Sequence, residues 1–143
     1  MTISFKDKVV IVTGAGGGLG RCHSLEFAKR GAKVVVNDLG GSVDGSGGSS
    51  DAANNVVKEI TEAGGVAIPN GSSVTDDDGV KNMVDQTRDE FGRIDVLINN
   101  AGILRDRSFT KMTMEDFTLV TDIHLMGSVK PTKMVWEIMK EQN

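Results

Sequence analysis

A glycine-rich stretch near the N-terminus has the composition of a phosphate-binding turn. Residues 13–20 read Thr-Gly-Ala-Gly-Gly-Gly-Leu-Gly, and Gly14, Gly18 and Gly20 give the spacing G-x-x-x-G-x-G. Glycine lets a backbone turn tightly and approach a ligand, while the N–H groups that open a helix attract negative charge. The stretch therefore predicts a pyrophosphate site. A tight strand-to-helix connection without any ligand is the alternative interpretation.

An acidic residue follows the second apolar run of the chain. Asp38 comes directly after Lys33–Asn37, where a carboxylate can accept hydrogen bonds from both hydroxyls of an adenosine ribose. A phosphate on the 2′ position would meet this negative charge, so the sequence favours NAD over NADP as the ligand. Alternatively, Asp38 only opens the loop that contains Leu39–Gly41.

These candidate residues lie between short apolar runs and longer amphipathic segments. The runs expected to form strands are 9–12, 33–37, 66–68 and 94–98. Helical spacing of apolar residues is found at 19–30, 52–60 and 80–91, and a long helix is expected after Thr113 as its N-cap. Strands that alternate with helices predict right-handed βαβ crossovers. The predicted fold class is α/β, a Rossmann-type doubly wound parallel sheet in three layers (α/β/α).

The predicted sheet is incomplete at its C-terminal side. A full dinucleotide-binding sheet has two halves and the strand order 3-2-1-4-5-6, whereas four strands are predicted here. Without a fifth strand, the fourth is an exposed apolar edge, which favours aggregation. We therefore expect residues 1–143 to form the NAD-binding portion of a larger domain. Pro131 is expected to kink the last helix rather than break it, because apolar spacing resumes at Met134.

Composition excludes several classes of function. A net charge of −4 and a pI near 5.1 argue against nucleic acid as a partner. No apolar run approaches the ~20 residues that cross a bilayer, so no membrane association is expected. The single cysteine, Cys22, excludes an internal disulfide and fits a reducing compartment, and two histidines make a dedicated metal site unexpected. We expect a cytoplasmic protein.

Three motifs together resemble the short-chain dehydrogenase/reductase family along essentially the whole chain. They are Thr13–Gly20, Asn37–Asp38 and Asn99–Gly102. Within that family, residues 35–41 and 102–109 are similar to the (3R)-hydroxyacyl-CoA dehydrogenase domains of peroxisomal multifunctional enzyme type 2 and its bacterial relatives. The resemblance implies an NAD-dependent oxidoreductase that transfers a hydride between nicotinamide and a hydroxyl/keto substrate, with 3-hydroxyacyl-CoA as the expected class. It also implies a homo-oligomer.

The resemblance implies a set of cofactor contacts. Gly14, Gly18, Leu19 and Gly20 would wrap the pyrophosphate, Asp38 would hold the ribose, Ser73 and Val74 would flank the adenine, and Asn99, Ala101 and Gly102 would pack beside the cofactor. Much of the family has an aspartate at the position of Ser73, and a serine is a weaker, uncharged partner. Asn99 could equally satisfy its own backbone at a strand end.

The family's proton chemistry uses a tyrosine, a lysine, a serine and often an asparagine on the long helix. The chain contains no tyrosine. The serine and the Tyr-x-x-x-Lys pair are expected beyond strand five, so these 143 residues alone are expected to bind cofactor poorly and not to turn over. His124 stands at the position of the asparagine and is a candidate catalytic residue in a proton relay. A hydrogen-bonded helix histidine is the alternative.

Two other functions compete with a dehydrogenase. A non-catalytic NAD-binding or partner-pairing module would need only the glycine turn and the sheet. A flavodoxin-like nucleotide binder would leave Asp38 and Asn99–Gly102 to be explained separately. Arg105 and Arg107 are candidates for binding a CoA phosphate or a carboxylate, with solvated loop charges as the alternative.

Overall fold

The computed structural model describes residues 3–42, 44–46 and 51–142; positions 43 and 47–50 of the Gly/Ser-rich insert lie outside the described residues. Its centre is a parallel sheet. The strands are β1 (Val9–Thr13), β2 (Lys33–Asn37), β3 (Val66–Asn70) and β4 (Val96–Ile98). Their order is β3-β2-β1-β4. This is the first part of the predicted 3-2-1-4-5-6 arrangement.

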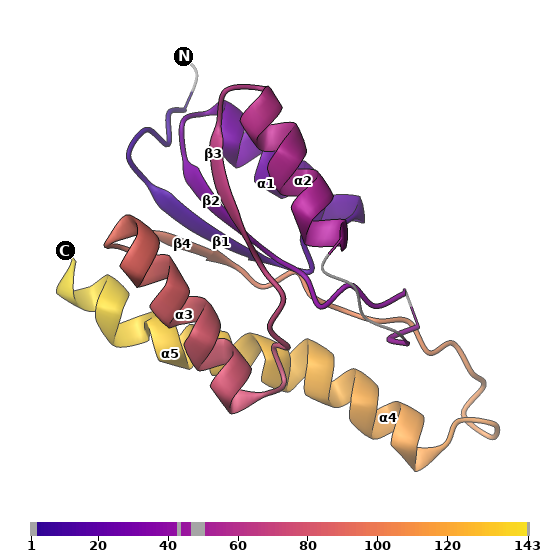
Figure 1. The fold of residues 1–143 in the computed structure, drawn as a ribbon. Coiled ribbons are helices and arrows are strands. Elements are labelled where there is room, and N and C mark those ends of the chain that lie inside the picture. The colour runs from indigo at the N-terminus through magenta and orange to yellow at the C-terminus, as the bar shows by residue number, and fades with distance from the viewer. Residues whose placement is uncertain (1–2, 43, 47–50, 143) are drawn as a thin grey trace.

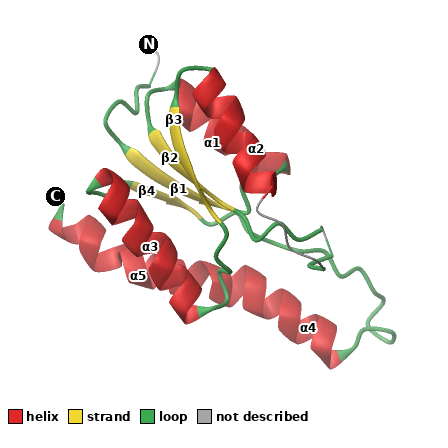
Figure 2. Cartoon of the chain, viewed as in Figure 1, coloured by secondary structure: helices red, strands yellow, loops and turns green. Residues whose placement is uncertain are grey.

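Helices cover both faces of the sheet (Figures 1 and 2). On one face lie α1 (Gly18–Lys29) and α2 (Asp51–Glu62), and on the other lie α3 (Asp77–Phe91) and α5 (Gly127–Glu141). The short helix α4 (Met114–Thr121) extends away from the sheet and leads through a π-helical turn, η1 (Asp122–Met126), into α5. The α/β class and its three layers are confirmed.

The two faces are separated by the alternation of side chains along β1. Val10 and Val12 belong to the apolar cluster beneath α1 and α2, whereas Ile11 belongs to the cluster beneath α3 and α5. All three side chains are fully buried. Successive side chains of a strand point to opposite faces, so an apolar run with no alternation requires cover on both. The sequence of β1 therefore dictates the layered fold.

The helix boundaries follow from capping residues. Thr113 accepts a hydrogen bond from the Asp116 N–H and begins α4, as the sequence predicts. Asp76 accepts from the Gly79 N–H and begins α3, while Gly92 ends it with φ +76°, in the left-handed region.

Pro131 does not break the last helix. α5 continues through it from Gly127 to Glu141. The irregularity lies in the preceding turn, where the Gly127 N–H bonds to the Asp122 carbonyl in a wider π-type turn.

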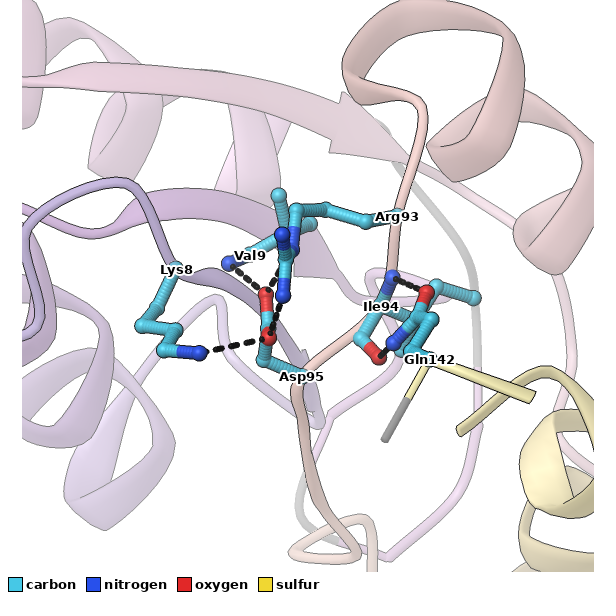
Figure 3. Close-up of polar contacts among 6 residues, drawn as sticks. All are labelled: Lys8, Val9, Arg93, Ile94, Asp95 and Gln142. Carbon is cyan, nitrogen blue, oxygen red and sulfur yellow. Dashed lines mark hydrogen bonds and ion pairs between the residues drawn. The ribbon is translucent and has the colours of Figure 1, made fainter. Parts of the chain in front are cut away.

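Two side chains fix the start of β4 (Figure 3). Gln142 donates to the Ile94 carbonyl at 2.5 Å and accepts from the Ile94 N–H at 3.0 Å. Beside it, the Asp95 carboxylate accepts from the Val9 N–H at 2.9 Å and from Arg93 and Lys8. The strand begins at Val96 and not at position 94 as predicted. Asp95 still donates its N–H to the Val9 carbonyl, whereas both backbone groups of Ile94 are bonded to Gln142.

Candidate cofactor-binding site

A cavity of about 440 Å³ lies at the carboxyl ends of the parallel strands. In doubly wound sheets this edge is where ligands bind. The lining includes residues of the glycine turn, of the end of β2 and its following loop, of the β3–α3 connection and of the segment after β4. Predicted cofactor residues in this lining are Gly14, Gly18, Asp38, Ser73, Val74, Ala101 and Gly102.

The start of α1 is open toward the cavity. Gly17 is the N-cap and provides no side-chain hydrogen bond, and no acidic residue occupies the first turn. A Cβ on Gly18, whose φ is +50°, would meet no atom within 4 Å. The first N–H groups of a helix lack intrahelical partners and carry partial positive charge. A diphosphate fits this cradle in both space and charge.

Gly14 and Gly20 serve a different purpose from Gly18, because both are packed against neighbours. A Cβ on Gly14 would lie 2.7 Å from the Ala101 Cα, and one on Gly20 would lie 2.2 Å from the Gly14 carbonyl and 2.5 Å from Asn100 Nδ2. No L side chain can be accommodated at such distances. These glycines let α1 approach the segment after β4.

Thr13 and Asn100 join the ends of β1 and β4. The Thr13 hydroxyl accepts from the N–H groups of Asn100 and Ala101 at 3.1 and 3.0 Å and donates to the Ile98 carbonyl. Asn100 Nδ2 returns hydrogen bonds to the carbonyls of Thr13 and Gly14 at 3.0 and 2.9 Å. The loop after β4 is thereby fixed against the glycine turn.

Asp38 is half-buried at the end of β2 and holds two backbone segments. Its Oδ2 accepts from the Gly16 N–H and its Oδ1 from the Gly40 N–H, both at 2.7 Å. A Cβ on Gly16 would lie 2.9 Å from the carboxylate, so only glycine permits this approach. Both interpretations of Asp38 are compatible with this geometry, since the carboxylate orders its loop and also lines the cavity.

A polar network lies beneath the β3–α3 connection. Buried Asn37 donates to Asn70 Oδ1 at 2.7 Å and to the Ser72 carbonyl at 2.9 Å. Ser73 shares a hydrogen bond of 2.9 Å with the Thr75 hydroxyl. Asn37 thus supports the β3–α3 connection, which forms one wall of the cavity, and its side chain carries no charge.

His124 stands behind the wall formed by Gly102 and Ile103. Its Nε2 lies 3.1 Å from the Ile103 nitrogen and 2.9 Å from the Ile103 oxygen, so the tautomer decides whether it accepts or donates. A Cβ on Gly102 would lie 2.7 Å from the imidazole ring. The lining includes Gly102 and Ile103 but not His124 itself. The alternative of a hydrogen-bonded helix histidine matches these contacts.

Three predicted cofactor residues do not line the cavity. The Leu19 side chain is 72% exposed on α1, Gly20 is buried under the turn, and Asn99 donates to the Thr132 hydroxyl of α5 at 2.9 Å. The role of Asn99 here is to tie β4 to α5. Leu19 and Gly20 can contribute to the cradle only through their backbone.

Arg105 is engaged within the protein. Its Nε donates to the Asp44 carbonyl at 2.7 Å, and its guanidinium pairs with Asp116 of α4 at 3.1 Å. Hydrogen bonds from Ser46 and Ser42 lower the pKa of Asp44 to about 2. Arg105 therefore joins the loop at Asp44 to α4, while Arg107 donates to the neighbouring Asp106 carbonyl.

Sequence reasoning missed the residues that act through hydrogen bonds to the backbone. Asn100, Gly16 and Ser72 were not among the predicted site residues, yet all three line the cavity. One available signal is the pair Asn99–Asn100. Neighbours in an extended segment point to opposite faces of the sheet, so if one side chain faces α5 the other faces the side of the glycine turn.

Among residues 3–42, 44–46 and 51–142, no helix is long and apolar enough to cross a bilayer. The same residues contain no group of three or more His, Cys, Asp or Glu side chains arranged to hold a metal ion.

Comparisons with known proteins show the family of the chain. The family model described as short chain dehydrogenase matches residues 8–143. The chain is 59% identical over 143 residues to peroxisomal multifunctional enzyme A of Dictyostelium discoideum and 51% identical over 141 residues to peroxisomal multifunctional enzyme type 2 of Mus musculus. These alignments cover 100% and 99% of this chain but 32% and 19% of the relatives.

A solved structure gives the same result for the fold. A 7α-hydroxysteroid dehydrogenase, complexed with NADH and 7-oxo glycochenodeoxycholic acid, is 31% identical and superposes with a TM-score of 0.87. The match covers 97% of this chain and 51% of that one. The chain thus spans about half the length of this enzyme and a third or less of the two peroxisomal relatives, whose names do not support the expected cytoplasmic location.

Proposed function

The chain belongs to the short-chain dehydrogenase family, and from this membership we propose that it is the NAD-binding portion of an oxidoreductase acting on a hydroxyl/keto pair. The observation that carries the proposal is the open start of α1 facing a cavity that Asp38 also lines. The first supplies donors for a diphosphate, and the second supplies a carboxylate for a ribose.

NAD is favoured over NADP because of the charge at the end of β2. Asp38 is the only charged side chain that lines the cavity among the described residues. A ribose hydroxyl can donate to its carboxylate, whereas a 2′-phosphate would bring two negative charges together with no cation in the lining. The Gly16 and Gly40 N–H groups keep the carboxylate in place.

When bound, the nicotinamide supplies the group that accepts or donates a hydride. The described residues orient the dinucleotide but provide no tyrosine as proton donor, since the sequence contains none. We propose that positions 1–143 alone do not catalyse turnover. Proton transfer would depend on residues outside these positions. His124 supports Gly102 and Ile103 at the cavity wall, and its role in a proton relay stays a prediction.

A 3-hydroxyacyl-CoA is the proposed substrate class. The support is the similarity of residues 35–41 and 102–109 to (3R)-hydroxyacyl-CoA dehydrogenase domains, together with 51–59% identity to two peroxisomal multifunctional enzymes. Arg105 is already paired with Asp116, which leaves exposed Arg107 as the freer of the two loop arginines toward a CoA phosphate.

We also propose a homo-oligomer that uses α5. Its outer face exposes Leu125 at the preceding turn, Val129 and Trp136, with 56%, 47% and 62% of their surfaces accessible, around a hollow of about 620 Å³. Apolar surface of this kind is typical of an interface between proteins.

The test of the proposed function is direct binding of NADH and NADPH to the protein and to its Asp38→Asn variant. The unsubstituted protein should bind NADH more tightly than NADPH. Asparagine removes the charge and keeps one acceptor oxygen, so the NADPH-to-NADH affinity ratio should rise by about tenfold, which corresponds to about 1.4 kcal/mol. Titration of the reduced cofactor's fluorescence measures both affinities.

Asp106→Asn is the matched control, because Asp106 carries an exposed carboxylate on the loop before α4. It should leave the affinity ratio unchanged. A ratio that is equally insensitive to Asp38→Asn would show that this carboxylate does not face the ribose. Because positions 1–143 alone are expected to bind cofactor poorly, weak NADH binding is compatible with the proposed function, and only a complete absence of NADH binding would refute it.

A further inference from the structure

The wall segment Ser72–Thr75, which connects β3 to α3, is supported at its first end from beneath. Asn37 donates to the Ser72 carbonyl at 2.9 Å, and the Ser72 hydroxyl donates to Asn82 Oδ1 at 3.1 Å. The segment then presents Ser72, Ser73 and Val74 to the cavity. The position of these side chains therefore depends on what holds the second end.

That second end is held by Lys130, which comes from the distant helix α5. Lys130 Nζ donates to the Thr75 carbonyl at 2.6 Å and forms an ion pair with Asp77 Oδ1 at 2.8 Å. The Lys130 side chain is 29% exposed, whereas Asp77 is 81% exposed. The hydrogen bond to the carbonyl is the better shielded of the two contacts, and a charged donor makes it stronger than a bond between neutral groups.

The backbone of α5 supports the same segment one turn earlier. A Cβ on Gly127 would lie only 2.7 Å from Val74 Cγ2, so the helix backbone itself packs on this side chain. Val74 is 7% exposed and lines the cavity. The π turn Asp122–Met126 ends immediately before Gly127. Lys130 and Gly127 are three residues apart, which places both on one face of the helix.

We propose that Lys130 is a positioning residue for the adenine end of the bound dinucleotide. It acts through the Thr75 carbonyl, which fixes where Ser73 and Val74 stand in the cavity wall. Its own amino group does not touch the ligand, since the carbonyl and Asp77 occupy it. This inference rests on the proposed function and adds to it a contribution from α5 to cofactor affinity.

The experiment compares three probes on the protein and on its Lys130→Met variant. Methionine keeps an unbranched stem of similar length and removes the donor. Affinities for NADH and for AMP, which both carry adenine, should fall by the same factor of about five to ten. The affinity for inorganic pyrophosphate, which requires only the cradle at α1, should stay within about twofold. Lys130→Arg, which retains a cationic donor, should restore AMP binding.

Two controls separate positioning from charge and from general loosening. Lys140→Met removes an exposed cation of the same helix that pairs with Glu137, and it should leave all three affinities unchanged. Asp77→Asn removes the ion pair but keeps the bond to Thr75, so AMP affinity should stay within about twofold.

The outcomes distinguish the two proposals. Unchanged AMP affinity in Lys130→Met, or an equal loss for AMP and pyrophosphate, would overturn the role of Lys130 while leaving the proposed function intact. A loss in Asp77→Asn as large as that in Lys130→Met would also overturn it. Failure of the unsubstituted protein to bind NADH and AMP would instead refute the proposed function.

Discussion

Asp95 should stabilise the folded protein by an amount that depends strongly on pH. The carboxylate accepts hydrogen bonds from the Val9 N–H, from Lys8 and from both the Nε and a terminal nitrogen of Arg93 (Figure 3). Burial raises the pKa of Asp95, but these hydrogen bonds outweigh burial and bring the pKa to about 2 from an ordinary value of 3.8.

The magnitude follows from linkage between proton binding and folding. One pKa unit corresponds to about 1.4 kcal/mol, so the depression amounts to about 2 kcal/mol of stability. The side chain is 9% exposed, which limits solvent screening. A folded-state pKa below the unfolded value means that this contribution is complete above about pH 4 and is lost as the pH falls toward 2.

Asp95→Asn is therefore expected to lower the free energy of unfolding by about 2 kcal/mol at pH 7. Urea denaturation at a series of pH values between 7 and 2 measures the difference between the two proteins, which should shrink as Asp95 becomes protonated. Asp106→Asn, which removes an exposed carboxylate, should match the unsubstituted protein throughout. A difference of equal size at pH 7 and pH 2 would refute the electrostatic origin of the effect.

Two further substitutions test how the cavity is built. Gly20→Ala would place a Cβ 2.2 Å from the Gly14 carbonyl and should destabilise the protein by about 1–3 kcal/mol in urea denaturation. Gly71→Ala, whose Cβ would meet nothing within 4 Å, should leave the stability unchanged. Equal stabilities of the two variants would contradict the close approach of α1. His124→Ala should weaken NADH binding several-fold in a fluorescence titration. His124→Asn, whose amide can still bond to the Ile103 backbone, should retain most of the NADH affinity. Identical affinities of the two variants would show that these hydrogen bonds do not contribute to NADH binding.

The strands and most helix ends could be predicted because their causes are local. The run Val9–Val12 is apolar at every position, which indicates burial on both faces, and Thr113 is an N-cap residue followed by acidic side chains. The start of β4 could not be predicted. Ile94, the predicted first residue, is bonded through both of its backbone groups to Gln142, which lies 48 positions away in sequence.

The site was predictable as far as glycines and charges mark it. Gly14, Gly18 and Asp38 reveal a turn and a carboxylate by residue type alone, and the structure brings them into one cavity. The supports behind them could not be found in this way. Asn37, Asn100 and Lys130 act on backbone carbonyls, and any hydrogen-bonding side chain at the right distance can do so, so their residue types carry no specific signal.

The two ends of the parallel strands differ in their polar side chains, and this difference affects ligand binding. At the start of β1 and β4, Asp95 is surrounded by cations that neutralise it. At the carboxyl ends of the strands, the neutral side chains of Thr13, Asn100 and Asn37 make many of the structural hydrogen bonds. A cation there would compensate Asp38, and an additional carboxylate would compensate the positive end of α1. Lys130, the cation that supports the β3–α3 connection, is paired with Asp77 and does not line the cavity. The fields of Asp38 and of the α1 N-terminus therefore remain directed into the cavity, one toward a ribose hydroxyl and one toward a diphosphate.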